Sequence, residues 1–167
     1  MLAFEIGNWE TKGRGLSVDG ELHEIEMTME ARWEVEGKSV EYKFTMVQDG
    51  KTLSSFGHKK YDVAKGIFIY RSKWGENPET TSHERYDPTT RTSHGQTAPT
   101  TPPTKTKTIT VGKRVGDDKT QQKLEVFEDG RLVYSHEVVS NRVGGNLPTN
   151  PEPPTPPVPT TPEPPTD

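Results

Sequence analysis

The sequence predicts an all-β fold, an antiparallel up-and-down β-barrel of about ten strands. Apolar and polar residues alternate with a period of two through most of the chain, as in strands that bury one face. Short turns rich in Gly and Asp separate these stretches, and no segment has a convincing helical pattern. A consecutive antiparallel sheet of this length is expected to close on itself, because closure removes its free edges.

The first strands define an inner and an outer face. A strand near Gly7 to Leu16 would turn Trp9 inward and its charged residues outward. The segment 22–35, LHEIEMTMEARWEV, is apolar at every odd position from Ile25 onward, and the next stretch, SVEYKFTM, alternates in the same way. Both are therefore predicted strands with one face toward the core.

A two-residue turn at Glu36-Gly37 tests this prediction. In the resulting register Trp33 faces Val40 and Phe44 faces Met29, while the opposite face pairs residues of opposite charge. One register thus places every apolar side chain on one side, and a shift by one residue would reverse the faces.

The remaining strands follow as hairpins. Asp49-Gly50 and the segment YDVAKG are predicted turns, and the segment KTKTITVGKRV is a further strand. A last hairpin turns at Asp129-Gly130, and its inward face is left open by the pattern. The side chains predicted to point inward from the two strands between residues 51 and 74 are Leu53, Ser55, Gly57, Lys59, Tyr61, Phe68, Tyr70, Ser72 and Trp74.

The stretch HERYDPTTRTSH, residues 83–94, is a further predicted hairpin. With a loop from Asp87 to Thr90, His83 falls opposite His94 on the outer face. A zinc site needs a third ligand, and none is evident on that face, so no metal site is expected.

Composition excludes several functions. The 21 basic and 25 acidic residues are well mixed and give a net charge of −4, so no nucleic-acid partner is expected. The chain has no cysteine, which excludes disulfides and thiolate chemistry. No membrane span and no signal peptide is visible, so a cytoplasmic location is the default, with export expected if the N-terminus is incomplete.

The chain divides by composition into two parts. Residues 1–145 are expected to form the barrel domain, and residues 146–167 a disordered Pro/Thr-rich tail or linker. The last twenty residues contain ten of the fifteen prolines and one aliphatic residue, Val158. Such a segment has little to bury and could tether a neighbouring domain or protein.

The predicted inner face combines aromatic, small and charged residues. Lys59 and Glu84 either pair near the mouth of the barrel or line a hydrated cavity, because a buried charge needs a partner or water. Glycines and serines on this face leave space for a ligand, and the alternative is a filled core with polar residues at its rim. The candidate ligand-binding residues are Trp33, Tyr42, Phe44, Lys59, Tyr70, Trp74, Glu84 and His136.

Five segments in order resemble a known family. IGNWE, ARWEVEGKSVEYKF, YDVAKGIFIYRSKW, SHERYDPTTRT and EVVSNRV, which lie within residues 5–143, resemble the bacterial domain of unknown function 1579 family. This resemblance implies a lipocalin-like, calycin-type barrel without an assigned activity. It also implies that Trp9 plugs one end of the barrel and that Arg142 from the last strand packs on it.

These observations favour a non-enzymatic, lipocalin-like barrel that binds a small, partly apolar ligand in its lumen without a cofactor. One alternative is a structural or protein-interaction module tethered by the Pro-rich tail. A second is a haem-binding barrel that resembles nitrobindin and uses His136. A third is a weak enzyme that uses Glu84, Lys59 or His136, although no serine-hydrolase motif is present.

Overall fold

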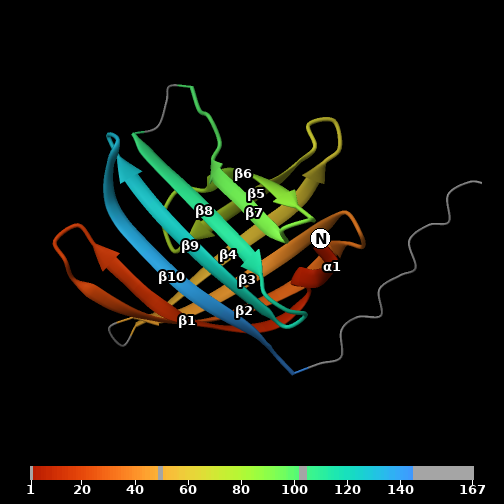
Figure 1. Cartoon of the computed structure of the whole chain (residues 1–167), viewed down its shortest axis with the longest axis horizontal. Coiled ribbons are helices and arrows are strands. Elements are labelled where there is room, and N and C mark those ends of the chain that lie inside the picture. The colour runs from red at the N-terminus through yellow and green to blue at the C-terminus, as the bar shows by residue number, and fades with distance from the viewer. Residues whose placement is uncertain (1, 49–50, 102–104, 145–167) are drawn as a thin grey trace, which may run out of the picture.

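The computed structural model describes residues 2–48, 51–101 and 105–144, which form a closed antiparallel barrel with its strands in consecutive order (Figure 1). The last strand pairs with the first, so the sheet has no free edge and the predicted fold class is confirmed. The predicted Asp49-Gly50 turn and the tail 146–167 lie outside the described residues. The elements are α1 (Leu2–Glu5), β1 (Gly7–Ser17), β2 (Leu22–Val35), β3 (Ser39–Gln48), β4 (Lys51–Asp62), β5 (Ile67–Trp74), β6 (Thr80–Asp87), β7 (Thr92–Thr97), β8 (Thr106–Arg114), β9 (Lys119–Glu128) and β10 (Arg131–Val143).

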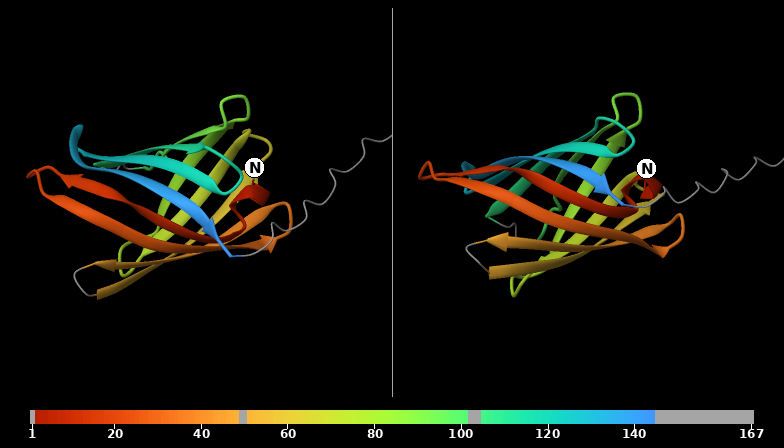
Figure 2. Two further views of the ribbon diagram at one scale, coloured as in Figure 1. Left: turned by 60° about the horizontal axis from the view of Figure 1, so that its bottom comes forward. Right: turned by 90° about the horizontal axis from the view of Figure 1, so that it is seen from below.

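The helix α1 is a feature that the sequence did not predict. It has four residues, too few to show a helical period, and it lies at one end of the barrel (Figure 2). The indole Nε1 of Trp9 donates a hydrogen bond to the carbonyl of Glu5 at 2.9 Å. This contact satisfies one of the carbonyl groups that a helix leaves unpaired at its C-terminal end.

The predicted register of the first hairpins is confirmed. Trp33 pairs with Val40 and Met29 with Phe44 between β2 and β3. On the outer face, Arg32 pairs with Glu41 and Glu30 with Lys43, as the charge pattern predicts. The pairings of β4 with β3 and β5 also match the prediction.

The predicted register of the β6–β7 hairpin is wrong by two residues. His83 pairs with Gln96, and His94 pairs with Arg85, so the two histidines do not face each other. The carboxylate of Asp87 accepts a hydrogen bond from the amide of Thr89 at 2.8 Å, which holds Asp87 at the end of its strand. Arg91 belongs to the turn, with φ of 54°, and the shift by two keeps each side chain on its predicted face.

The inward face of the last hairpin, which the sequence left open, is decided by a β-bulge. The register shifts between Leu132 and Tyr134, and this shift places Tyr134 opposite Val126 and His136 opposite Leu124. A strictly alternating pattern cannot reveal such an extra residue.

The small residues of the inner face serve mainly close packing. A Cβ at Gly57 would lie 2.8 Å from the ring of Tyr70, and one at Gly15 would meet the ring of Tyr134. A Cβ at Gly13 would meet the backbone of Glu137 and Val138. The expectation that these glycines leave space for a ligand is therefore wrong, since neighbouring strands and rings occupy that space.

The two ends of the barrel differ. The closed end, as we call it, carries α1, and the buried core cluster of Leu2, Ala31, Val40 and Tyr42 lies there (Figure 1). The open end carries the β1–β2 and β9–β10 hairpins, at the opposite ends of the same strands. Burial is thus concentrated where the N-terminal segment covers the lumen.

We predict that Gly13→Ala lowers the free energy of unfolding by about 2 to 3 kcal/mol, because the added methyl group overlaps the backbone of β10. Urea unfolding measures the change. Gly116→Ala is the matched control, since nothing lies within 4 Å of a Cβ at that position. Equal effects of the two substitutions would contradict the close approach of β1 and β10.

Candidate functional site

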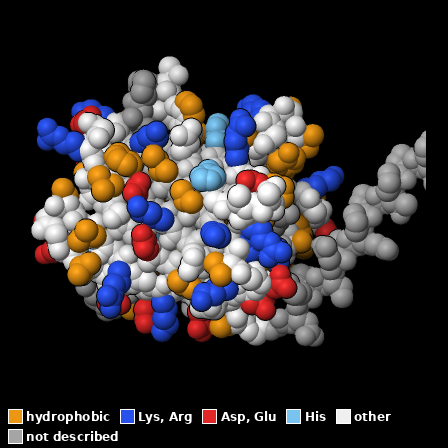
Figure 3. All heavy atoms as spheres, viewed as in Figure 1, with side chains coloured by type: hydrophobic (Ala, Val, Ile, Leu, Met, Phe, Trp, Pro, Cys, Tyr) orange, Lys and Arg blue, Asp and Glu red, His pale blue; other side chains and the backbone are white. Residues whose placement is uncertain are grey.

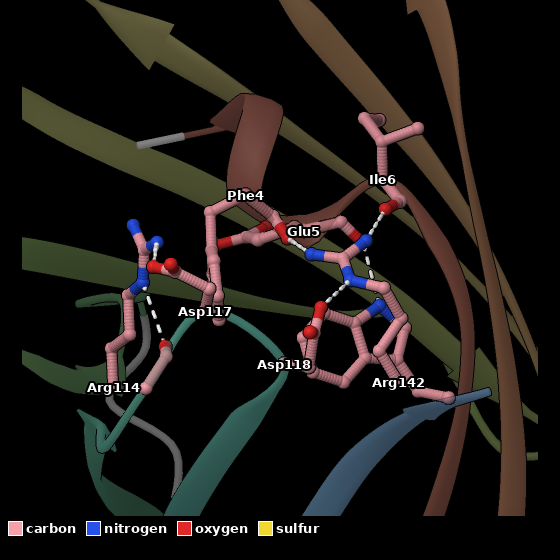
Figure 4. A network of polar contacts seen from close by, with 9 residues as sticks. Phe4, Glu5, Ile6, Arg114, Asp117, Asp118 and Arg142 are labelled. Carbon is pink, nitrogen blue, oxygen red and sulfur yellow. Dashed lines mark hydrogen bonds and ion pairs between the residues drawn. The ribbon is translucent and has the colours of Figure 1, made fainter. Parts of the chain in front are cut away.

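Arg142 connects the N-terminal segment to the barrel at the closed end (Figure 4). Its guanidinium donates hydrogen bonds to the carbonyl groups of Phe4, at 2.5 Å, and of Ile6. Its Nε contacts the carboxylate of Asp118 at 2.9 Å, and only 5% of the Arg142 side chain is exposed. The last strand therefore holds the segment that covers the closed end.

The predicted stacking of Arg142 on Trp9 is confirmed. The guanidinium carbon lies 4.4 Å from the centre of the indole, and Trp9 is 2% exposed. Phe4 packs edge-on against Trp9 and lies 4.0 Å below the guanidinium carbon of Arg114. These contacts make the closed end a packed layer of rings and guanidinium groups.

A buried ionic cluster lies beside this layer. The ammonium of Lys59 contacts Glu5 at 2.8 Å and Glu84 at 2.9 Å. The hydroxyl of Tyr42 donates a hydrogen bond to the second carboxylate oxygen of Glu5. Lys59 and Glu84, which the sequence marked as a possible pair, are therefore paired, and Glu5 is a third member that sequence reasoning missed.

Burial controls the protonation of this cluster. It raises the pKa of Glu5 above the usual value, although the ammonium of Lys59 acts in the opposite direction. Burial would lower the pKa of Lys59, but Glu5 and Glu84 outweigh it and hold that pKa above its ordinary value. Burial also raises the pKa of Tyr70 to about 12. Lys59 is thus a charged structural group at neutral pH and not a base.

The open half of the lumen has a different character. Several of its inward side chains remain partly exposed although they point into a closed barrel, while Ile25 and Ser55 on the same face are buried. We call one side the apolar wall, formed by Met27, Phe44, Met46 and Trp74. We call another side the hydroxyl wall, formed by Ser82, Thr97, Thr108 and Thr110. Leu124, Val126, Tyr134 and His136 complete the ring from β9 and β10.

Small residues on β4 allow the aromatic rings of the neighbouring strands to meet. Ser55 lies between Phe44 and Trp74, whose rings stack at 5.7 Å with an interplanar angle of 28°. Phe44 also stacks on Tyr42 at 5.9 Å. Ser55 is fully buried, and its hydroxyl has no hydrogen-bond partner among the described residues.

His136 lies on the inner face of the open half, and His23 lies on the same face on the other side of Gly15, with its Nε2 2.6 Å from the hydroxyl of Ser17. Burial lowers the pKa of His136, so its imidazole is neutral at neutral pH. Its Nδ1 lies 3.4 Å from the hydroxyl of Tyr134, and burial raises the pKa of that tyrosine. Among the described residues, no group of three or more His, Cys, Asp or Glu could hold a metal ion.

The structure separates the predicted ligand-binding residues into two groups. Tyr42, Lys59 and Glu84 belong to the closed-end cluster, and Trp33 and Tyr70 pack against the core there. Trp74 and His136 face the open half, and Phe44 lies between the two groups, because it packs against the core cluster and also stacks on Trp74. The hydroxyl wall was missed, although the alternating threonines of KTKTITVGKRV carry its signal.

The face of the barrel seen in Figure 3 carries basic and acidic side chains intermixed. A shallow groove of about 320 Å³ crosses β1, β2 and β3, and polar or charged side chains such as Glu10, Glu30 and Lys43 line it. It lies outside the barrel wall. No helix among the described residues has the length and apolarity needed to cross a membrane.

Comparisons with known proteins identify the fold. No family model and no curated protein matches the sequence, so the resemblance to the domain of unknown function 1579 family stays a prediction. The S-type phycobiliprotein lyase CpeS from Guillardia theta matches with a TM-score of 0.65 and 7% identity over 87% of this chain and 92% of that chain.

Two further solved structures share the barrel. Rv2717c from M. tuberculosis matches with a TM-score of 0.66 and 16% identity, covering 86% of this chain and 95% of that chain. A DUF3598 family protein of unknown function from Nostoc punctiforme matches with a TM-score of 0.60 and 14% identity, covering 86% of this chain and 49% of that chain. At these identities the likeness shows the fold alone, a lipocalin-like barrel.

The difference in stability between Glu5→Gln and the wild type is expected to shift in favour of the variant as the pH rises from about 4 to 8. The raised pKa means that the folded protein favours the protonated carboxyl. Protonation of Glu5 therefore contributes to the stability of the wild type. This contribution is complete below the usual glutamate pKa and is lost as the pH rises through the raised pKa. Thermal unfolding at several pH values measures it, with the exposed Glu10→Gln as control. A difference from wild type that does not change with pH would contradict this account.

Ser55→Ala is expected to raise the free energy of unfolding by up to about 1 kcal/mol, because it removes a buried hydroxyl that has no partner among the described residues. Ser72→Ala is the matched control. Ser72 is also buried, but its hydroxyl lies 3.2 Å from that of Thr80, so its loss should destabilise. Urea unfolding compares both, and destabilisation by Ser55→Ala would show that its hydroxyl is satisfied.

Proposed function

We propose that the protein binds a small, partly apolar molecule in the open half of its lumen and performs no chemistry on it. The observation that carries the proposal is the partial exposure of the apolar and hydroxyl walls inside a closed barrel. A concave surface that is mostly apolar, with a few convergent polar groups, is the usual form of a ligand site.

The arrangement of charges also favours binding over catalysis. Lys59 and Glu84, two of the candidate catalytic groups, hold each other and Glu5 at the closed end. Because Lys59 and Glu84 are enclosed and joined to Glu5 of α1, they hold α1 against the barrel. His136, which is neutral, and His23 remain in the open half, and no carboxylate contacts either of them among the described residues.

The difference between the two ends of the barrel also suggests where a ligand would enter the lumen. Rings, Arg142 and the core cluster fill the closed end. At the open end, the connections β1–β2, β5–β6, β7–β8 and β9–β10 lie around the mouth, and no helix of the described residues covers it. A ligand would therefore enter beside Trp74 and His136, since both lie toward that end of their strands.

The test is a fluorescence titration with N-phenyl-1-naphthylamine, an uncharged apolar probe whose emission rises in an apolar site. Thr108→Phe, which fills the lumen, should weaken binding about tenfold or more, equivalent to about 1.4 kcal/mol. Val111→Phe places the same side chain on the outer face of β8, where Val111 is 37% exposed, and should leave affinity within about twofold.

Absence of probe binding, or equal losses in both variants, would contradict the proposal. Native mass spectrometry of the purified protein gives a second readout, because a retained ligand adds its mass. A retained haem would be visible by its absorbance and would favour the haem-binding alternative through His136.

A further inference from the structure

The open half of the lumen has a composition that restricts the charge of its ligand. None of the residues of the apolar wall or the hydroxyl wall is Asp, Glu, Lys or Arg. Among the described residues, the inner face carries charges again at the hairpin tips, where Lys51, Glu128 and its partner Arg131 are exposed. A charged ligand would therefore lose its hydration without gaining a counter-ion, which is costly.

The charged groups of the closed end cannot serve as that counter-ion. Lys59 is held by two carboxylates, and Arg142 by two carbonyl groups and Asp118. Arg114 contacts the carbonyl of Gly116 at 3.0 Å and Asp117 at 2.6 Å. Each of these cations is already paired within the fold, and Phe4 lies between the two guanidinium groups.

The apolar wall favours a flat ligand. The rings of Tyr42, Phe44 and Trp74 form a stacked row, with interplanar angles of 11° and 28° between neighbours. Rings in a stacked row face one another, so a planar conjugated molecule can extend the row at its Trp74 end and gain stacking energy that a saturated molecule does not. Ser55 is small enough to let this row form.

The opposite side of the lumen offers neutral hydrogen-bonding groups. In a ten-strand barrel, a strand five places away lies across the lumen, so β8 faces β3 and β10 faces β5. Phe44 and Trp74 are thus opposite Thr108, Thr110 and His136. A hydroxyl donates and accepts, and a neutral imidazole does the same, so these groups suit a polar but uncharged edge.

We infer that the open half selects an uncharged, planar, conjugated molecule with a hydrogen-bonding edge, and that it rejects carboxylates and ammonium ions of the same shape. The ring system continues the stacked row at Trp74, and its polar edge faces Thr108, Thr110 and His136. This inference rests on the proposed function, because it assumes that the lumen is the binding site.

Four probes of nearly equal size test it by isothermal titration calorimetry at pH 7.5. They are 2-naphthol, 2-naphthoate, 2-naphthylmethylammonium and the saturated decahydro-2-naphthol. The expected result is that 2-naphthol binds at least about tenfold more tightly than each of the other three. Thr108→Lys adds a cation at the hydroxyl wall and should shift the preference toward 2-naphthoate.

The outcomes separate this inference from the proposed function. Equal or tighter binding of either ion, lost in Thr108→Phe but not in Val111→Phe, would overturn the charge selection and leave the lumen site intact. Equal binding of the saturated probe would overturn the planar requirement. Binding that neither variant affects, or no binding at all, would overturn both the inference and the proposed function.

Discussion

The buried guanidinium of Arg142 is the interaction on which the rest of the structure depends. It comes from the last strand, stacks on Trp9 of the first strand, and donates to the carbonyl groups of Phe4 and Ile6. One side chain thus joins the seam where the barrel closes and fixes the segment that covers one end. Because the segment is fixed, Glu5 reaches Lys59 and Tyr42, and this cluster secures the cover from the other side.

The asymmetry of the lumen follows from that cover. Aromatic rings, paired charges and the core cluster exclude water from the closed end. The buried charges there, which are costly to desolvate, hold the N-terminal segment against the barrel. The open half then needs no charged side chains, and it contains aromatic rings on one side with hydroxyl groups across from them. The buried charges that stabilise the fold and the proposed binding surface thus lie at opposite ends of one barrel.

The sequence predicts the fold well because a period of two determines the face of each residue, and opposite charges determine the register of β2 and β3. It predicts the candidate site less well. The helix α1 is too short to have a period, so Glu5 could not be connected with Lys59, which is 54 residues away. The bulge after Leu132 leaves no compositional trace, so the face of His136 required the structure. The glycines that suggested space instead mark close approaches, as at Gly13.

The central claim is that the barrel is covered at one end and accessible at the other. Methyl NMR with the small neutral paramagnetic probe TEMPOL tests it directly in the unmodified protein, because the probe broadens only those methyl signals that it can approach. The account predicts strong broadening of Met27 and Met46, which face the open half, and little broadening of Leu2 and Val40, which are 6% and 0% exposed. Equal protection of all four would indicate a packed lumen, and equal broadening would indicate an uncovered closed end. Either result would contradict the account.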